Sequence, residues 1–291
     1  MATETSALVA LSNDVASTVE RVAASVVAVE ARSRIGSSGF YIRPDLILTA
    51  DHALESDEVE IVRAGGESER ASIVGRDPST DLALLRTENA GAPLEFAGTD
   101  AMRVGAIVLA VARDDDGDLA ATMGVLSAVG AAWRTWQGGE IDRFVRPDLS
   151  LYPRFSGSPL IDVAGRVIGL NTGGLSRRQA LTVPVSTIQR VVETLLTRGG
   201  RIPRGYLGVA LHSIDGGAIV LGVAPGSPAE RGGIIVGDVI TGIGGNKASD
   251  ADDVHAALAA STPGEQIAID VLRGGNPQQL NVTVGERPER S

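Results

Sequence analysis

The chain has 291 residues, 43% of them hydrophobic, and a formal net charge of −10 at pH 7. That apolar content is enough for about two globular domains and excludes an intrinsically disordered chain. An acidic surface attracts neither nucleic acid nor an anionic membrane, so we expect neither as a partner. The absence of cysteine excludes disulfides and thiolate metal sites, and nothing else in the composition points to a metal or a cofactor.

The N-terminal segment, residues 1–24, is predicted to be helical, with Ser12 or Asn13 as the cap. Its apolar positions recur at intervals of four and three residues: Val15, Val19, Val22 and Val26. Residues 1–30 lack the basic start, apolar core and small-residue cleavage site of a secretory signal, and no segment of the chain resembles a transmembrane span. A cytoplasmic location is therefore the default expectation, unless a signal has been removed.

Short strands rich in Val, Ile and Leu, separated by Gly, Asp, Asn or Pro turns, are predicted from about residue 25 to 184. Examples are 25–31, 40–42, 46–50, 104–111 and 166–171. A helix is predicted over 185–197, with Gly199-Gly200 as its C-terminal stop. We therefore expect a first domain over residues 25–200 that is built from strands and closed by one helix.

A second, smaller domain is predicted over residues 205–285, after a short stiff linker at 201–204. It contains strands and two helical stretches, one of them at 253–260. Residues 286–291 are expected to form a tail.

Ser156 is the candidate nucleophile, because it lies in a tight loop between two apolar, strand-like runs. A serine hydroxyl is a poor nucleophile at neutral pH, so it needs a base and an orienting acid. His52, just beyond a strand end, is the candidate base, and Asp81, at the start of another strand, is the candidate acid. The order His, Asp, Ser is that of the chymotrypsin double barrel, whereas an α/β-hydrolase would have Gly where this chain has Arg154 and Ser158.

Six motifs support this interpretation by their shared order along the chain. They are Gly39-Phe-Tyr-Ile42, Leu48-Thr-Ala-Asp-His52, Gly75-Arg-Asp-Pro-Ser-Thr-Asp81-Leu-Ala-Leu-Leu85, Arg103-Val-Gly-Ala-Ile-Val-Leu-Ala110, Gly165-Arg-Val-Ile-Gly-Leu-Asn171-Thr172 and Tyr206-Leu-Gly-Val209. Together they resemble the HtrA/Deg family of serine proteases over nearly the whole chain. The resemblance implies a mainly β fold, a chymotrypsin/trypsin-like double β-barrel followed by a small α+β PDZ domain.

The resemblance also implies an activity, that of an ATP-independent serine endopeptidase acting on unfolded or misfolded proteins. Ser156 would attack the peptide carbonyl, His52 would transfer the proton, and Asp81 would orient the imidazole. Three other acids compete for the role of Asp81. Asp77 precedes Pro78 and is interpreted as a turn residue, while Asp51 and Asp57 are too close to His52 in the sequence to match the family pattern.

The second domain is expected to bind peptide C-termini. Tyr206, Leu207, Gly208 and Val209 resemble the PDZ loop whose amides bind a terminal carboxylate, so hydrophobic peptide C-termini are the expected ligands. Members of the family are commonly homotrimers held by the N-terminal segment. Residues 1–30 contain no aromatic anchor, so the sequence leaves the oligomeric state open.

The nucleophile segment departs from the family pattern Gly-Asn-Ser-Gly-Gly, because this chain has Arg154-Phe155-Ser156-Gly157-Ser158. The backbone of Arg154, Phe155 and Ser156 is expected to form the oxyanion hole, with the amides of residues 154 and 156 as donors. Glycine adopts the required angles at position 154 easily, so arginine there predicts a hole that is only partly formed at rest. A rival interpretation is that Pro153 and Phe155 hold Arg154 in the working geometry without strain.

Two further expectations follow from these departures. The first is an alternative function, in which the altered loop (Arg154, Phe155, Ser158) leaves a weakly active or inactive protease-fold chaperone or peptide-binding protein. The second concerns an acidic run at 112–118, which replaces a family loop rich in Gly, Asn, Pro and Phe. Its spacing does not match an EF-hand calcium loop, so we expect a solvated turn.

Overall fold

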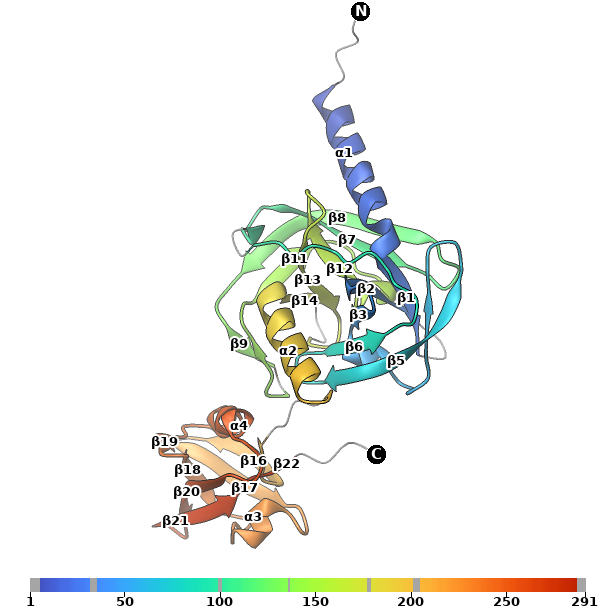
Figure 1. The fold of residues 1–291 in the computed structure, drawn as a ribbon. Helices are drawn as coiled ribbons and strands as arrows, with labels where there is room; N and C mark the ends of the chain where they lie inside the picture. Colours follow the sequence, from blue (N-terminus) through green and yellow to red (C-terminus); the bar gives the residue numbers. More distant parts are fainter. Residues whose placement is uncertain are drawn as a thin grey trace, which may run out of the picture. The chain divides into compact units, whose positions relative to one another are not determined.

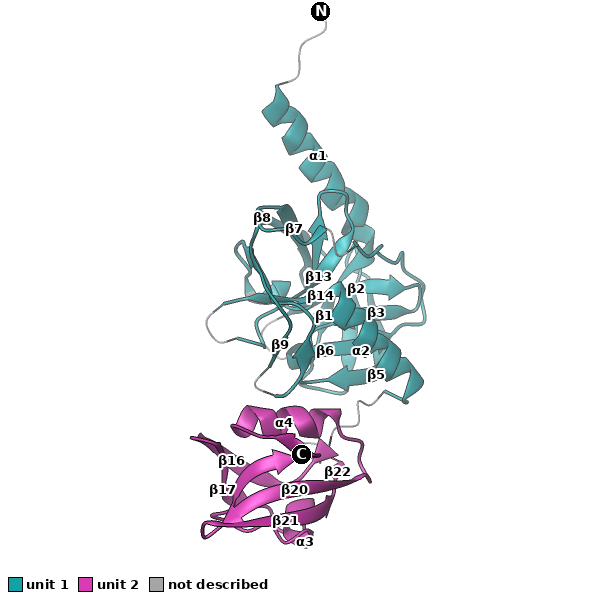
Figure 2. Ribbon diagram, turned by 90° about the vertical axis from the view of Figure 1, so that its left-hand side faces the viewer, with its two compact units in different colours: residues 1–202 teal, residues 203–291 magenta. Residues whose placement is uncertain are grey.

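The computed structural model describes residues 6–31, 36–98, 101–135, 137–176, 179–200 and 205–286. The chain divides into two compact units, residues 1–202 and 203–291 (Figures 1 and 2). The predicted linker at 201–204 lies outside the described residues, as does most of the predicted tail. No helix among the described residues is long and apolar enough to cross a membrane.

The first unit begins with helix α1 (Ala7–Val22) and a 3₁₀ turn (Ala23–Ser25). Six strands then close into a barrel in the order β1-β2-β3-β6-β5-β4. These are β1 (Val26–Glu30), β2 (Ser37–Arg43), β3 (Leu46–Thr49), β4 (Val59–Val62), β5 (Ser68–Asp77) and β6 (Leu82–Arg86). A 3₁₀ turn, Asp51–Ala53, follows β3.

A second six-stranded antiparallel sheet has the order β11-β8-β7-β12-β13-β14, and its edge strands β11 and β14 contact each other. Its strands are β7 (Ile107–Arg113), β8 (Leu119–Val129), β11 (Val145–Asp148), β12 (Pro159–Asp162), β13 (Val167–Thr172) and β14 (Leu181–Pro184). A small hairpin of β9 (Trp133–Arg134) and β10 (Glu140–Ile141) lies between β8 and β11, a 3₁₀ turn spans Pro153–Phe155, and helix α2 (Val185–Thr197) ends the unit.

The apolar runs of the first unit arise because both faces of a strand such as β3 are buried. Ile47 lies in one hydrophobic cluster with other residues of the first barrel. Leu46 and Leu48 point the other way, into a cluster shared with the second sheet and with Ile188 of α2. A strand buried on both sides contains consecutive apolar residues rather than an alternation. This shared core fixes the strand ends that carry the candidate site residues.

The second unit is a five-stranded antiparallel sheet in the order β16-β17-β18-β20-β21, with β19 pairing on β18 and a separate pair of β15 and β22. Its elements are β15 (Gly205–Tyr206), β16 (Val209–Ile214), β17 (Gly217–Val223), α3 (Pro228–Arg231), β18 (Val239–Ile243), β19 (Asn246–Lys247), α4 (Ala251–Ala260), β20 (Gln266–Arg273), β21 (Asn276–Thr283) and β22 (Gly285–Glu286). The predicted mainly β fold, two β-barrels followed by a small α+β domain, is confirmed.

Several predicted boundaries were wrong: the strand at 40–42 spans 37–43, the helix at 253–260 begins at residue 251, and two further elements begin elsewhere than predicted. The N-terminal helix begins at Ala7, with Ser6 at the cap position, so that Ser12 and Asn13 lie inside it. Alanine and leucine in residues 7–11 favour helix strongly, which explains the earlier start. The strand predicted over 104–111 begins only at Ile107, because Gly105 has a φ of +86° and forms a turn in which the Ala106 amide donates to the Arg103 carbonyl.

The helix over 185–197 was predicted with its observed bounds. Gly199 and Gly200 both have positive φ, and the Gly200 amide donates to the Leu195 carbonyl at 2.8 Å, which ends the helix.

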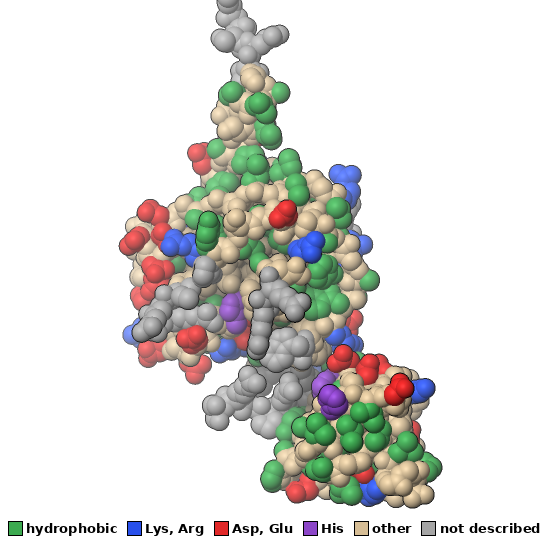
Figure 3. All heavy atoms as spheres, turned by 180° about the vertical axis from the view of Figure 1, so that it is seen from behind, with side chains coloured by type: hydrophobic (Ala, Val, Ile, Leu, Met, Phe, Trp, Pro, Cys, Tyr) green, Lys and Arg blue, Asp and Glu red, His purple; other side chains and the backbone are tan. Residues whose placement is uncertain are grey.

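Acidic and basic side chains are interspersed over the face shown in Figure 3.

Candidate active site

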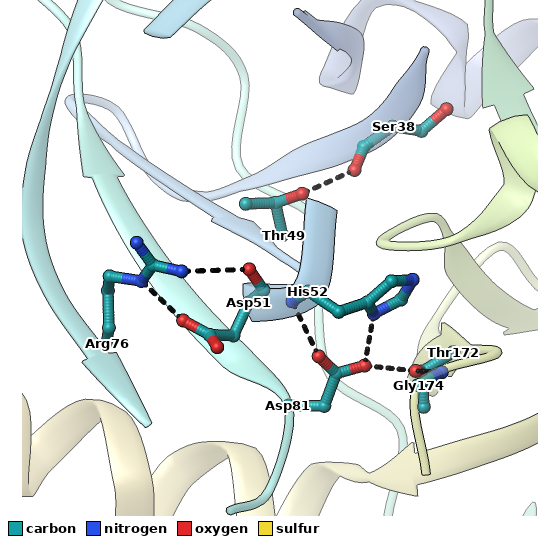
Figure 4. A network of polar contacts seen from close by, with 8 residues as sticks. All are labelled: Ser38, Thr49, Asp51, His52, Arg76, Asp81, Thr172 and Gly174. Atoms are coloured by element: carbon teal, nitrogen blue, oxygen red, sulfur yellow. Dashed lines mark hydrogen bonds and ion pairs between the residues drawn. The ribbon is translucent and has the colours of Figure 1, made fainter. Parts of the chain in front are cut away.

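His52 and Asp81 form a hydrogen-bonded pair at the end of the first barrel. Nδ1 of His52 lies 2.7 Å from Oδ2 of Asp81, and the His52 amide donates to Oδ1 of the same carboxylate at 2.8 Å (Figure 4). The Asp81 side chain is only 4% exposed, whereas that of His52 is 28% exposed. The acid is therefore shielded from water, while the imidazole remains accessible to a substrate.

The position of Asp81 depends on an unusual backbone conformation. It is the only non-glycine residue, among those that the structure describes, with a positive φ (59°). A preceding turn leads into it, in which the Asp77 carboxylate accepts hydrogen bonds from the hydroxyls of Ser79 (2.6 Å) and Thr80 (2.7 Å). Left-handed conformations in non-glycine residues cluster at functional sites, where the surroundings hold them in place.

Thr172, at the end of β13, donates a hydrogen bond to Oδ2 of Asp81, and its hydroxyl also accepts from the Gly174 amide at 2.8 Å (Figure 4). The backbone passes so close that a Cβ atom on Gly174 would lie 2.6 Å from both Asp81 Oδ2 and His52 Nδ1. The segment after β13, from the second sheet, thus holds the acid that the first barrel supplies.

Ser156 lies close to the same segment. A Cβ on Gly173 would lie 3.8 Å from Ser156 Oγ, next to the position where Gly174 approaches the His52–Asp81 pair. The Ser38 amide donates to the Ser156 carbonyl at 2.9 Å, and the Gly157 amide donates to the Asn171 carbonyl at 2.8 Å. The three predicted residues therefore converge, although the described hydrogen bonds do not include one between Ser156 Oγ and His52.

Gly157 is required by this docking. Its φ is +82°, and a Cβ there would lie 2.1 Å from the Ser38 carbonyl oxygen, so no other residue fits. The loop after the candidate nucleophile is consequently pressed against β2 of the first barrel.

The turn before Ser156 contains Arg154. Pro153–Phe155 form a 3₁₀ turn, and the Phe155 amide donates to the Tyr152 carbonyl at 2.9 Å. The Arg154 carbonyl accepts from Ser38 Oγ at 2.9 Å, and φ of Arg154 is not positive. Arginine adopts such a turn without strain.

The competing acids have other partners. Asp51 pairs with Arg76, whose Nε lies 2.5 Å from Oδ1. Burial raises the pKa of Asp51 above its usual value, although Arg76 opposes the shift. Asp77 is the turn residue that its sequence predicted, and Asp57 is exposed. Among the described residues, no group of three or more His, Cys, Asp or Glu side chains is arranged to hold a metal ion.

Two contributors to the site were missed by the sequence interpretation. Thr172 is 91 residues from Asp81, and Ser38 is 116 residues from Arg154, so no local pattern reports either contact. The one available signal is that Thr172 ends one of the six motifs shared with the family, although nothing in that motif indicates what its hydroxyl contacts.

In the second unit, the predicted peptide-binding loop connects β15 to β16. Leu207 is buried in the core of the unit, and Gly208 has a φ of +81°. The carbonyls of these two residues accept hydrogen bonds from the amides of Ala229 and Ala224, at 2.8 Å each. Their own amides donate to no partner among the hydrogen bonds of the described residues. The loop therefore has two free donors at the start of β16, which is an edge strand of its sheet.

Helix α4 lies beside that edge strand. The Ala251 amide donates to Ser213 Oγ of β16 at 3.1 Å, and α4 contacts β16 along with the neighbouring strands. An edge strand beside a helix, with free amides at one end, is the arrangement in which a PDZ domain binds an added peptide strand.

Comparison with known families agrees with this geometry. The profile of the "Trypsin-like peptidase domain" matches residues 37–170, and that of the "PDZ domain" matches residues 205–284. The chain is 32% identical over 272 residues to a protein of Ectopseudomonas mendocina named "Probable periplasmic serine endoprotease DegP-like", a match that covers 87% of this chain and 56% of that protein. HhoB of Synechocystis is 31% identical over 280 residues, with 87% and 67% covered.

Solved structures give the same result. The serine endoprotease from Yersinia pestis superimposes with a TM-score of 0.76 at 28% identity, covering 95% of this chain and 98% of that one. The "HtrA-type protease AlgW with decapeptide" also gives 0.76, at 27% identity, covering 94% and 99%. The chain spans little more than half the length of the first curated relatives that it matches. By sequence and by structure, it belongs to the HtrA/Deg family of trypsin-like serine proteases with a PDZ domain.

Proposed function

We propose that this protein is an ATP-independent serine endopeptidase that cleaves unfolded or misfolded proteins. Ser156 attacks the scissile carbonyl, His52 accepts the hydroxyl proton and returns it to the leaving amine, and water then hydrolyses the acyl-enzyme. Asp81 holds the imidazole in one tautomer and stabilises its charged form.

The observation that carries the proposal is the buried Asp81 carboxylate against Nδ1 of His52. With Nδ1 donating to Asp81, Nε2 has its lone pair free, and it faces away from the carboxylate (Figure 4). Ser156 needs a base with that free nitrogen. Hydrogen bonds between a nucleophile and its base are often long before substrate binds, so the absence of one here is compatible with catalysis.

The oxyanion hole is proposed to be incomplete at rest. Tyr152, Pro153, Arg154 and Phe155 form a four-residue turn in which Arg154 occupies the third position. A type I turn has negative φ at that position, whereas a type II turn needs positive φ there and has its central peptide turned over. Arginine favours the type I turn, in which the amide of residue 154 points away from the oxyanion that forms on the substrate carbonyl. Glycine also tolerates the type II turn.

The second unit is proposed to bind hydrophobic peptide C-termini. The free amides of Leu207 and Gly208 suit a terminal carboxylate, and the edge strand β16 suits an added peptide strand. We expect affinities of roughly micromolar Kd for short peptides, because a flexible ligand must be ordered on binding. Calorimetry with matched peptides tests this: amidation of the C-terminus should weaken binding, and equal affinities for acid and amide would remove the PDZ assignment.

The test of the catalytic proposal is labelling with a fluorophosphonate, which reacts with an activated serine whatever peptide the enzyme prefers. We expect labelling of the wild-type protein, none of Ser156→Ala, and strongly reduced labelling of His52→Ala. A folded wild-type protein that stays unlabelled, even with denatured protein present, would instead favour the chaperone alternative.

A further inference from the structure

Ser38, on β2 of the first barrel, contacts the nucleophile segment at two points. Its amide donates to the Ser156 carbonyl at 2.9 Å, and its hydroxyl oxygen lies 2.9 Å from the Arg154 carbonyl oxygen. The residue is fully buried, although serine is usually found at the surface. A buried hydroxyl needs hydrogen-bond partners, and here one of them belongs to the turn that precedes the candidate nucleophile.

The hydroxyl of Ser38 has one proton, and its neighbours determine where that proton points. The Arg113 amide donates to the hydroxyl oxygen at 3.1 Å, so this contact uses a lone pair. The proton has two acceptors in reach, the carbonyls of Arg154 at 2.9 Å and of Arg113 at 3.3 Å, and the shorter bond is the stronger one. Arg113 is itself fixed, because its buried side chain donates to the carbonyls of Val26 (2.7 Å) and Gly117 (2.5 Å). The proton of Ser38 is therefore directed to Arg154.

This bond orients the peptide group that joins Arg154 to Phe155. The carbonyl end of the group accepts from Ser38, and the amide end donates to the Tyr152 carbonyl at 2.9 Å. A change between type I and type II turns flips the preceding peptide group and leaves the Arg154 carbonyl nearly in place. The Ser38 bond is therefore common to both turn forms, and its role is separate from the equilibrium between them.

The second bond orients the peptide group that follows Ser156. The carbonyl end accepts from the Ser38 amide at 2.9 Å, and the amide end, which belongs to Gly157, donates to the Asn171 carbonyl at 2.8 Å. Ser156 thus lies between two peptide groups that are each held at both ends. Ser38 supplies one bond to each group.

Thr49 connects this arrangement to the candidate base. It ends β3, just before the 3₁₀ turn that carries His52, and its hydroxyl donates to the Ser38 carbonyl at 2.8 Å (Figure 4). The candidate triad is divided between two sheets, because His52 and Asp81 follow strands of the first barrel and Ser156 precedes β12 of the second sheet. A residue that joins β3 to both sides of Ser156 is suited to fix the distance between base and nucleophile.

Arg154 has a second contact, but it is the weaker one. Its guanidinium Nη1 lies 2.9 Å from Asp114 Oδ2, at the start of the acidic run that was expected to be a solvated turn. The other three aspartates of the run are exposed, as expected, whereas Asp114 is half-buried and paired. The Arg154 side chain is 46% exposed, and ion pairs at such sites contribute little. A buried hydroxyl bonded to a carbonyl is costlier to lose, because the acceptor is left without its partner.

We propose that Ser38 is a positioning residue which, through its hydroxyl on the Arg154 carbonyl and its amide on the Ser156 carbonyl, holds Ser156 at its working distance from His52. The inference rests on the proposed protease function. Reacting groups that are misplaced by about 1 Å lose about 10² in rate. Ser38 therefore acts on kcat through the placement of the nucleophile and not through binding of the substrate.

The experiment compares Ser38→Ala with Ser37→Ala by kcat and KM on a denatured protein substrate. Ser37 is the matched control, because it is the neighbouring residue of β2, is also buried, and donates its hydroxyl to the Val29 carbonyl at 3.1 Å within the first barrel. Each variant loses a buried hydroxyl, and only Ser38→Ala loses a contact with the nucleophile segment. End-point labelling with the fluorophosphonate counts the active enzyme in each preparation.

We expect Ser38→Ala to lower kcat about tenfold, less than a full 1 Å displacement, because the amide of residue 38 still holds the Ser156 carbonyl. KM should stay within about twofold of wild type, and Ser37→Ala should keep the wild-type kcat. Ser38→Cys, which keeps a side chain of similar size with a weaker donor, should lower kcat by a smaller factor and serves if Ser38→Ala does not fold. A wild-type kcat in the folded Ser38 variants, or an equal loss in Ser37→Ala, would overturn the proposal.

A second readout does not depend on activity. Hydrogen exchange of the peptide covering 150–158, measured on the full chain, should be about two- to ten-fold faster in Ser38→Ala than in Ser37→Ala, the factor that corresponds to one hydrogen bond. If the wild-type protein resists the fluorophosphonate, the proposed function fails, yet this comparison still decides whether Ser38 holds the segment. Equal exchange in the two variants would show that it does not.

Discussion

The two sides of the candidate site are held in different ways. The His52–Asp81 pair, from the first barrel, is fixed by two contacts to one buried carboxylate and by Thr172 from the second sheet. The turn before Ser156 is held instead by Ser38 on a carbonyl and by one ion pair at the surface. The first arrangement is buried and held at several points, whereas the second depends on two contacts of one residue, Arg154.

This difference separates two ways in which a substitution can act. A change near Asp81 removes a partner from a buried hydrogen-bond network, so we expect it to lower activity. If the turn has the two forms proposed above, a change there shifts their equilibrium and can raise activity. Substitutions on the two sides of the site should therefore change kcat in opposite directions.

Replacing Asp81 should have the largest effect on kcat. We expect Asp81→Asn to lower kcat by about 10⁴, because an amide no longer selects the tautomer in which Nε2 of His52 is free. Asp57→Asn, a matched change at an exposed acid near His52, should leave kcat unchanged. Steady-state hydrolysis of a denatured protein measures both. Activity of Asp81→Asn within tenfold of wild type would remove Asp81 from the proposed triad.

Adding a methyl group beside His52 and Asp81 should lower kcat by a smaller factor. Gly174→Ala places a methyl group 2.6 Å from both partners, so the imidazole must move, and a displacement of about 1 Å is expected to lower kcat by about 10². Gly173→Ala is the matched control, since its methyl group meets only Ser156 Oγ, at an ordinary 3.8 Å. The ratio of the two kcat values is the measurement. Similar losses in both variants would mean that the approach of Gly174 is not critical.

Removing the side chain of Arg154 should raise kcat, whereas the two substitutions above lower it. We expect Arg154→Gly to raise kcat about tenfold or more, because glycine adopts positive φ without the cost of order 1 to 3 kcal/mol that a side chain pays in an unfavourable region. The gain should exceed any gain of Arg154→Met, which removes the ion pair with Asp114 but keeps the side chain at Cα. An unchanged or lower rate in a well-folded Arg154→Gly variant would favour the rival interpretation of a working geometry without strain.

The sequence predicted elements best where a local pattern decided the outcome. The helix at 185–197 has one apolar face and two glycines after it, and it was predicted with its observed bounds. His52 and Asp81 were placed at strand ends because barrel strands here are continuous apolar runs with polar stops. The start of the N-terminal helix was wrong, since a capping residue inside a strong helix-forming segment does not begin a helix by itself.

Contacts between distant segments could not be predicted in this way. Asp114 and Arg154 are 40 residues apart, and both were identified as departures from a family pattern, yet nothing in the sequence connected them. The positive φ of Asp81 was also not foreseen, because aspartate ordinarily has negative φ and no local pattern around it indicates the exception. The sequence indicated which residues could be catalytic, whereas the contacts that hold those residues in place were found only in the structure.

The smallest expected effect concerns Asp51, next to His52. Burial raises the pKa of its carboxyl in the folded protein, even though Arg76 favours the ionised form. The folded state therefore binds a proton more tightly than the unfolded state. Wild-type stability should fall, through this group, as pH rises from the unfolded pKa of about 3.9 through the raised folded value. Asparagine does not titrate, so the stability of Asp51→Asn should not fall with pH through this residue.

Urea unfolding of wild type and Asp51→Asn between about pH 3.5 and 7 measures the contribution. Their difference in unfolding free energy should move in favour of Asp51→Asn as pH rises across this window, because burial raises the pKa of Asp51 and Arg76 offsets the burial cost only in part. The loss of the Arg76 partner adds a term that is constant with pH, so the slope and not the offset is diagnostic. Activity should change less than threefold, because Asp51 does not contact the imidazole through any described hydrogen bond. A slope of the opposite sign would mean that the ion pair with Arg76 affects the pKa of Asp51 more than burial does. The segment that carries His52 would then be stabilised by an ion pair, like the turn that contains Arg154.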